Sequence, residues 1–225
     1  MGSMSAPSSP ARGRPARLNQ ARTVQTALDL LNESGLDALT MRRLADAMGV
    51  QAGALYRYFA TKQDLLTAMA EHMLGGVADA TGPAEDGDWS EATARLARAL
   101  RTALLAHRDG ARVYAGTHST GPNTLGFADG LIGVLRAAGF SDGEAARALY
   151  AVSHFTVGHT LEEQAALRTE DGGPANAEVL HEAVVEAGRY PHLAATLPVL
   201  TSTDFTAHFE FGLRLLLDGL RAVRR

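Results

Sequence analysis

The sequence predicts an all-α protein, and three observations support this fold class. Apolar residues recur every three or four positions through most of the chain, which places them on one face of a helix. No segment shows the sustained apolar–polar alternation of a half-buried strand. The glycine patterns of Rossmann and P-loop nucleotide-binding folds are also missing. With 225 residues, of which 46% are hydrophobic, the chain can bury a substantial core.

Cap residues and helix-ending glycines separate the predicted helices. Asn19 and Thr40 are residues of the type that caps a helix N-terminus. Gly35 and Gly49 are placed to end the two helices that begin after these caps. The stretch that begins at Thr61 has the pattern of a capping box. The expected helices cover, in chain order, residues 20–34, 41–48, 51–58, 61–73, 90–107, 123–138, 144–167, 177–187 and 205–223.

Composition excludes several classes of protein. The chain contains no cysteine, so disulfides and thiolate metal sites are excluded, and a reducing cytoplasm suits it. No apolar run approaches the roughly 18 residues that a membrane helix needs. The N-terminus lacks the apolar block of a signal peptide. We therefore expect a cytoplasmic protein that does not contact membranes.

The two short helices joined across Gly49 have the pattern of a helix-turn-helix motif. In this motif the first helix braces the second, and the second lies in the DNA major groove with its N-terminal residues facing base edges. We expect Leu55 and Phe59, four positions apart, to face inward. Tyr56 and Tyr58 then point outward, where their hydroxyls can reach phosphates; burial in the core is the alternative for both tyrosines.

The distribution of charge is consistent with contact between this end of the chain and a polyanion. The whole chain has a formal net charge of −4, but residues 1–62 carry +4 and the remaining residues carry −8. A nucleic acid would be attracted to the first part and repelled by the second. Because the charges in residues 1–62 form a small sample, a chance asymmetry is the alternative explanation.

Three segments carry a resemblance to a known family: TMRRLADAMGV at 40–50, GALYRYF at 53–59 and KQDLL at 62–66. They resemble the DNA-binding domain of the TetR family of transcriptional regulators, over about residues 20–70. The resemblance implies a homodimer in which each subunit presents one helix-turn-helix to half of a palindromic double-stranded DNA operator. The residues placed at the DNA, by the resemblance or by position in the bracing helix, are Arg42, Arg43, Gln51, Ala52, Gly53, Ala54, Tyr56, Tyr58 and Lys62.

The expected domain organisation follows from this motif and from composition. Residues 1–18 are rich in Ser, Pro, Ala, Gly and Arg, so we expect a disordered basic arm, with residues 1–3 left from an expression tag. The arm resembles arginine-rich arms that enter a minor groove, and a solvated leader is the equal alternative. Residues 19–65 are the expected DNA-binding domain, and a connecting helix joins it to an effector-binding and dimerisation domain at 66–225.

Three later segments resemble the tetracycline repressor subgroup of the same family: HRDGARVYAGT at 107–117, SHFTVGHTLEEQ at 153–164 and FEFGLRLLLDGL at 209–220. The resemblance implies a helical core with a pocket of drug size. It also implies a dimer formed by the last helix and the long helix around His154. The positions implied as ligand contacts are Leu96, Leu100, Tyr114, His118, His154 and Glu162.

The chain departs from that subgroup at several of these positions. A histidine that binds magnesium in the subgroup corresponds to Tyr114, and an asparagine and a phenylalanine that anchor the drug correspond to Leu96 and Leu100. An arginine corresponds to His118, and a second histidine to Ala78. A neutral phenol is a poor magnesium ligand. We therefore expect a small, largely hydrophobic effector rather than magnesium–tetracycline, and no bound metal or cofactor.

Other uses of the His154 region stay open from the sequence. His159 and Glu163 share one helix face and His154 and Glu162 another, so each pair is two ligands short of a tetrahedral metal site unless a dimer joins them. A helical enzyme with His154 as base and Glu162 as its partner is a further alternative, but no nucleophile or cofactor loop accompanies it. The last alternative is an activator, or a DNA-binding module without a ligand. The leading interpretation is a transcriptional repressor and not an enzyme.

Overall fold

The computed structural model describes residues 19–81, 88–167 and 177–224. Within these ranges the chain is helical and contains no strand, which confirms the predicted all-α class. The elements are α1 (Gln20–Ser34), α2 (Met41–Met48), α3 (Ala52–Leu55), α4 (Lys62–Met73), the 3-10 helix η1 (Val77–Thr81), α5 (Trp89–Leu105), α6 (Gly110–Ala115), α7 (Pro122–Ala137), α8 (Asp142–Ala166), α9 (Ala177–Ala187), α10 (Pro191–Leu200) and α11 (Phe205–Val223).

The caps expected at the start of the chain are present. The side chains of Asn19 and Thr40 each accept a hydrogen bond from the backbone N–H three residues later, at 2.8 and 3.1 Å. Thr61 and Asp64 accept each other's backbone N–H groups, as a capping box requires. Gly49 ends α2 with a φ of 66°, in the left-handed region that glycine adopts without strain. Local sequence therefore sets where α1, α2 and α4 begin and where α2 ends.

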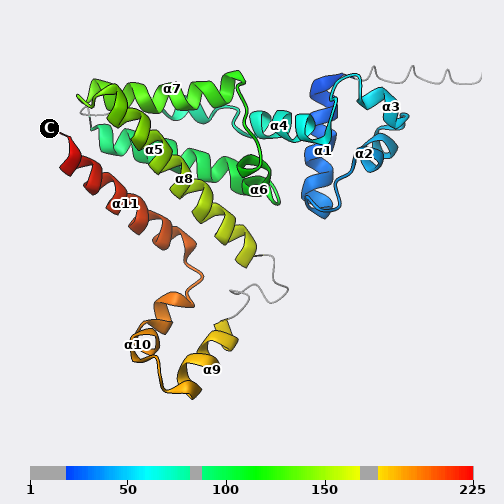
Figure 1. Cartoon of the computed structure of the whole chain (residues 1–225). Helices are drawn as coiled ribbons and strands as arrows, with labels where there is room; N and C mark the ends of the chain where they lie inside the picture. The colour runs from blue at the N-terminus through cyan, green and yellow to red at the C-terminus, as the bar shows by residue number, and fades with distance from the viewer. Residues whose placement is uncertain (1–18, 82–87, 168–176, 225) are drawn as a thin grey trace, which may run out of the picture.

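Helices α1, α2, α3 and the first half of α4 form a small bundle around Leu28, Leu44, Leu55 and Leu65, all of which are fully buried. Figure 1 shows this bundle at one end of the molecule, with α4 leading from it into the larger body. The expected domain boundary after residue 65 falls inside α4. One helix therefore belongs to both parts.

The body is built from η1 and helices α5, α6, α7, α8 and α11. Helix α5 packs against η1, α6, α7 and α8 and buries a stripe of Leu96, Leu100 and Leu104. Helix α11 packs against α8, where Phe209 stacks on Phe155 with 5.5 Å between ring centroids. None of the helices in the described ranges is long and apolar enough to cross a membrane.

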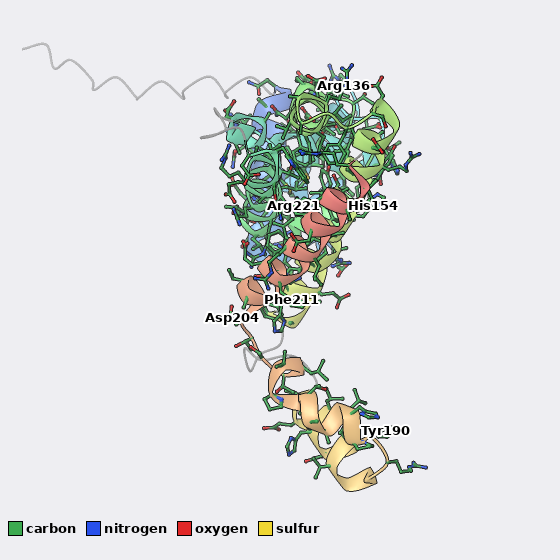
Figure 2. All side chains as sticks on the ribbon, turned by 90° about the vertical axis from the view of Figure 1, so that its left-hand side faces the viewer. Arg136, His154, Tyr190, Asp204, Phe211 and Arg221 are labelled. Carbon is green, nitrogen blue, oxygen red and sulfur yellow. The ribbon has the colours of Figure 1, made fainter. Side chains whose placement is uncertain are left out.

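Helices α9 and α10 form a hairpin that projects from the body (Figure 1). Figure 2 shows Tyr190 on this hairpin, far from His154 and Phe211 on the body. The sequence did not predict α10, because Pro198 lies inside the helix and proline normally interrupts one. Pro191 is at the first turn, where proline is tolerated.

Other differences from the expected helices are small. Helix α3 ends at Leu55, and the N–H groups of Tyr58 and Phe59 both bond to the Leu55 carbonyl in the turn that follows, at 2.9 and 3.0 Å. The short elements α6 and η1 were not predicted. The basic arm expected at 1–18 lies outside the described residues.

Candidate DNA-binding surface and ligand cavity

The helix-turn-helix has an apolar inner face and a polar outer face. Leu44 and Leu55 have no exposed area and Phe59 is 2% exposed, so they form the seam between the two helices and α1. Tyr56 and Tyr58 are 51% and 43% exposed, which excludes the core alternative for both. Both side chains therefore lie on the outer face of the motif.

The other residues placed at the DNA share this outer face to different extents. Arg42, Gln51 and Gly53 are exposed, while the remaining members of the set are partly exposed: Arg43, Ala52, Ala54 and Lys62. A methyl group at Gly53 would meet no atom within 4 Å, so the start of α3 presents open space to a DNA groove. Arg43 has its guanidinium 3.6 Å from the carboxylate of Glu33, in an exposed pair that is weak in water.

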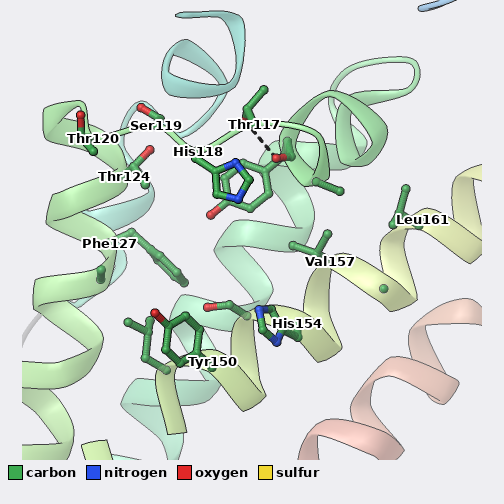
Figure 3. Close-up of a pocket in the computed structure, with 16 residues that line it drawn as sticks. Thr117, His118, Ser119, Thr120, Thr124, Phe127, Tyr150, His154, Val157 and Leu161 are labelled. Carbon is green, nitrogen blue, oxygen red and sulfur yellow. Dashed lines mark hydrogen bonds between the residues drawn. The ribbon is translucent and has the colours of Figure 1, made fainter. Parts of the chain in front are cut away.

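A cavity of about 580 Å³ lies in the body, within the size range of small-molecule sites. Figure 3 shows its walls, which come from the end of α6, the α6–α7 segment, α7 and α8. The lining residues are Tyr114, Ala115, Thr117, His118, Ser119, Thr120, Thr124, Phe127, Ala128, Leu149, Tyr150, Ser153, His154, Val157, Gly158 and Leu161.

Three of the six expected ligand contacts line this cavity: Tyr114, His118 and His154. The other three are elsewhere. Leu96 and Leu100 are fully buried in the hydrophobic core on the inner stripe of α5. Glu162 is exposed, because it lies eight residues after His154 and is rotated by about 80° from it around the helix.

The face of α8 that lines the cavity is instead a regular stripe. Tyr150, His154, Val157 and Leu161 recur at spacings of four, three and four residues, and all of them line the cavity. This is the spacing that keeps side chains on one helical face. The same spacing in the sequence could have identified Leu161, rather than Glu162, as the partner of His154.

The cavity walls combine aromatic and apolar side chains with several hydroxyl groups. Figure 3 shows Phe127 and Tyr150 on one part of the wall and Thr117, Ser119 and Thr120 on another. Burial, with a smaller contribution from the negative charge of Glu71, raises the pKa of Tyr114 above its ordinary value of 10.0. Its phenol is therefore neutral at physiological pH and can donate one hydrogen bond to a ligand.

Polar contacts join the DNA-binding bundle to the elements that wall the cavity. The carboxylate of Asp109, just before α6, accepts the backbone N–H of Leu36 at 2.9 Å. Arg112 of α6 bonds Asp37 at 3.1 Å. Gln63 of α4 donates to the carbonyl of Gly116 at the end of α6, at 2.7 Å. Helix α6 therefore touches the bundle at both of its ends.

His159 and Glu163, one of the two pairs considered for metal binding, are engaged in packing contacts instead. The two guanidinium nitrogens of Arg101 hold the carboxylate of Glu163 at 2.8 and 2.7 Å. His159 lies 3.9 Å from that carboxylate, and its Nε2 is 3.0 Å from the carbonyl of Phe205. The residues that the structure describes contain no group of three or more histidine and acidic side chains arranged to hold a metal ion.

Comparison with known proteins agrees with this arrangement. The family described as "Bacterial regulatory proteins, tetR family" matches residues 24–69, and the one described as "Tetracyclin repressor-like, C-terminal domain" matches residues 81–224. The tetracycline repressor protein class A of transposon 1721, from Escherichia coli, is 42% identical over 204 residues, which cover 91% of either chain.

Two crystal structures of Streptomyces coelicolor proteins are also similar. One, of a possible TetR family transcriptional regulator, is 82% identical and superposes with a TM-score of 0.86, over 92% of this chain and all of that chain. The other, the TetR family protein ActR in complex with actinorhodin, is 33% identical with a TM-score of 0.83, over 93% of this chain and 99% of that chain. The chain belongs to the TetR family of transcriptional regulators.

Proposed function

We propose that this protein is a homodimeric repressor that leaves a palindromic operator when a small, largely hydrophobic molecule occupies the cavity. The observation that carries this proposal is the connection between the two sites. Helix α4, which extends from the bundle that holds the exposed helix-turn-helix, packs against α6, whose end walls a cavity of about 580 Å³, through contacts such as that of Gln63 with Gly116. A ligand that changes the position of these helices changes the spacing of the two DNA-reading surfaces in the dimer.

The chemistry of the cavity indicates the class of effector. Phe127, Tyr150, Val157 and Leu161 favour a planar, apolar molecule, and the hydroxyl groups of the cavity wall favour a molecule with hydrogen-bonding groups at its edge. The neutral phenol of Tyr114 is a poor ligand for Mg²⁺. We therefore propose an aromatic effector that binds without a metal ion. The ActR complex with actinorhodin supports a small-molecule effector, since actinorhodin is the ligand of a similar structure.

The dimer and the compartment follow from the same argument. Tyr150 of α8 and Phe211 and Leu215 of α11 are large apolar side chains that are more than half exposed. We propose that they are covered in a dimer formed by these two helices from each subunit. A regulator that binds an operator acts where the DNA is, so we place this protein in the cytoplasm.

The DNA-binding residues can be tested without knowing the operator. A duplex is first selected by the wild-type protein from a randomised pool, and its affinity is then measured by fluorescence anisotropy over a range of salt concentrations. In a variant with Tyr58→Ala and Lys62→Ala we expect binding to be lost, or the slope of log K against log salt to fall by about 0.9 for each lost phosphate contact. The matched control, Arg189→Ala with Tyr190→Ala, removes the same kinds of group from an exposed part of the hairpin and should bind normally.

The effector class has a separate test. Planar aromatic compounds are added to the protein–duplex complex in the absence of Mg²⁺. Release of the duplex by members of this panel supports the proposal. Failure of every aromatic compound, or release that requires Mg²⁺, would contradict the effector class. Failure of the wild-type protein to select any duplex would contradict the repressor function itself.

A further inference from the structure

Glu71, near the end of α4, has its carboxylate at the N-terminus of α7. One oxygen accepts the backbone N–H of Asn123 at 2.5 Å. The other accepts the hydroxyl of Ser119 at 2.9 Å and both the hydroxyl and the backbone N–H of Thr124, at 2.7 and 3.1 Å. The side-chain amide of Asn123 donates in return to the backbone carbonyl of Glu71, at 2.9 Å. Glu71 is therefore the point at which α4 is fixed to α7.

The absence of a side chain at residue 121 makes room for this carboxylate. A methyl group on Gly121 would collide with the carboxylate of Glu71 and with the carbon that precedes it. Gly121 has a φ of −75°, which any residue adopts, so its backbone conformation does not require glycine. The close approach of the Glu71 side chain is the feature of this structure that requires glycine at residue 121.

Two of the groups that hold Glu71 also line the ligand cavity. Ser119 and Thr124 belong to its wall, as Figure 3 shows. A hydroxyl group has a single hydrogen to donate. A ligand atom that accepts a hydrogen bond from either hydroxyl must therefore take that hydrogen away from Glu71.

Helix α4 carries the consequence to the DNA surface. Lys62 is its first residue and Glu71 its tenth, so about 14 Å of helix separates the two at a rise of 1.5 Å per residue. Gln63 fixes the first turn of α4 to the end of α6, and Glu71 fixes the other end to α7. Loss of the second attachment removes the polar restraint at this end of α4 and leaves the apolar packing of Met69, Ala70 and Leu74, over which α4 can tilt and carry the helix-turn-helix with it.

We propose that Glu71 is the positioning residue that couples the cavity to the DNA-binding surface, and that a ligand with a hydrogen-bond acceptor directed at Ser119 or Thr124 releases it. This inference rests on the proposed repressor function. Burial raises the pKa of Glu71, but the hydrogen bonds from Thr124, Asn123 and Ser119 lower it more, so the net pKa lies below the ordinary 4.5. The carboxylate is ionised at neutral pH and can hold these donors as charge-assisted hydrogen bonds.

Two variants break this attachment in different ways. Gly121→Ala displaces the carboxylate by a collision, and Glu71→Gln removes its charge. Both should weaken binding to the selected duplex without any effector, by roughly 5- to 150-fold, the usual range of coupling between sites. A change of charge alone would have the opposite sign, because removing a negative charge strengthens attraction to DNA. Gly133→Ala is the matched control, since it adds the same methyl group to α7 where no atom lies within 4 Å.

A second readout separates coupling from simple loss of stability. The chain has no cysteine, so Gln25→Cys on the exposed side of α1 places one spin label on each subunit. We expect the distribution of label distances in the dimer to shift or broaden in Gly121→Ala and Glu71→Gln but not in Gly133→Ala. Circular dichroism checks that all three variants are folded. A pair of variants that bind the duplex like wild type, with unchanged label distances, would overturn the inference and leave the repressor function intact.

A mutational cycle tests whether the cavity wall acts through Glu71. Ser119→Ala combined with Thr124→Val removes the two hydroxyl donors, and we expect it to weaken duplex binding in the same direction as Glu71→Gln. The triple variant should lose less binding free energy for the duplex than the sum of the losses in the Ser119→Ala, Thr124→Val variant and in Glu71→Gln, because both sets of substitutions break the same contact. Strictly additive effects would show that the hydroxyls and Glu71 act independently, which contradicts the proposal.

Discussion

Arg101 and Glu163 form an ion pair inside the body, and replacing Arg101 with alanine tests how strongly this pair holds α5, α8 and α11 together. The side chains are only 14% and 8% exposed. The pair is bidentate, with nitrogen–oxygen distances of 2.8 and 2.7 Å. Arg101 also lies over the ring of Phe209, 5.1 Å from its centroid, and bonds the hydroxyl of Thr206 at 3.3 Å.

The expected cost of Arg101→Ala comes mainly from the partner that it leaves behind. Glu163 would be a buried carboxylate without its counter-ion, and breaking a buried pair from one side costs about 3–5 kcal/mol. For a chain of this size each kcal/mol lowers Tm by roughly 2–4 °C, so we expect a fall of roughly 6–20 °C. Arg101→Met together with Glu163→Leu should recover most of the loss, because apolar groups of similar volume remove the unpaired charge.

Urea unfolding measures these effects, at one protein concentration because dimerisation contributes to apparent stability. Arg136→Ala is the control: its pair with Asp142 is 2.8 Å long, but its side chains are 61% and 85% exposed. We expect it to cost less than about 1 kcal/mol. A loss in Arg101→Ala as small as that of this control would refute the reasoning, and so would a double variant less stable than the single one.

Three further predictions concern local contacts. Leu96→Ala should lower the free energy of unfolding by about 2–5 kcal/mol but leave the affinity of a cavity ligand unchanged in calorimetry, since Leu96 is a core residue; a large loss of affinity in a well-folded variant would contradict this assignment. Thr61→Ala should cost about 0.5–2 kcal/mol in urea unfolding, because it removes one half of the capping box of α4. The folded-state pKa of Glu71 lies below 4.5, so its stabilising contribution is complete above that pH and is lost as the pH falls through the folded-state value. The stability difference between wild type and Glu71→Gln should therefore shrink on acidification, and a difference that stays constant down to pH 3 would count against the contact.

The parts of the fold that the sequence could predict are those with local causes. Thr40 caps α2 through a hydrogen bond three residues away, and Gly49 ends it in a left-handed conformation; both signals lie within a few residues of the structure that they produce. The outward direction of Tyr56 and Tyr58 follows from the inward direction of Leu55 in the same short segment. The resemblance to the family implied the roles expected of these residues, and the periodicity predicted their orientation.

The parts of the fold and of the site that the sequence could not predict depend on contacts between residues far apart in the chain. Helix α6 begins directly after Asp109, whose φ of 58° is unusual for a residue with a side chain. The carboxylate of Asp109 accepts the backbone N–H of Leu36, 73 positions earlier. No local pattern contains that contact. The same holds for Leu96 and Leu100: the resemblance implied ligand contacts, but the stripe on α5 that they share with Leu104 packs into the core.

The junction between bundle and body combines apolar packing, with Met69 and Leu74 of the α4 region fully buried in it, and hydrogen bonds, and the two have different consequences for switching. The apolar contacts resist opening in proportion to their buried area, whereas the hydrogen bonds can exchange their donors with a ligand or with water. The pair between Arg112 and Asp37 is too exposed to contribute much, since the Asp37 side chain is 86% exposed. The four donors on Glu71 are then the principal polar restraint on α4. A ligand that competes for two of them has to supply about 1–3 kcal/mol of differential binding, a small part of the roughly 8 kcal/mol of micromolar affinity.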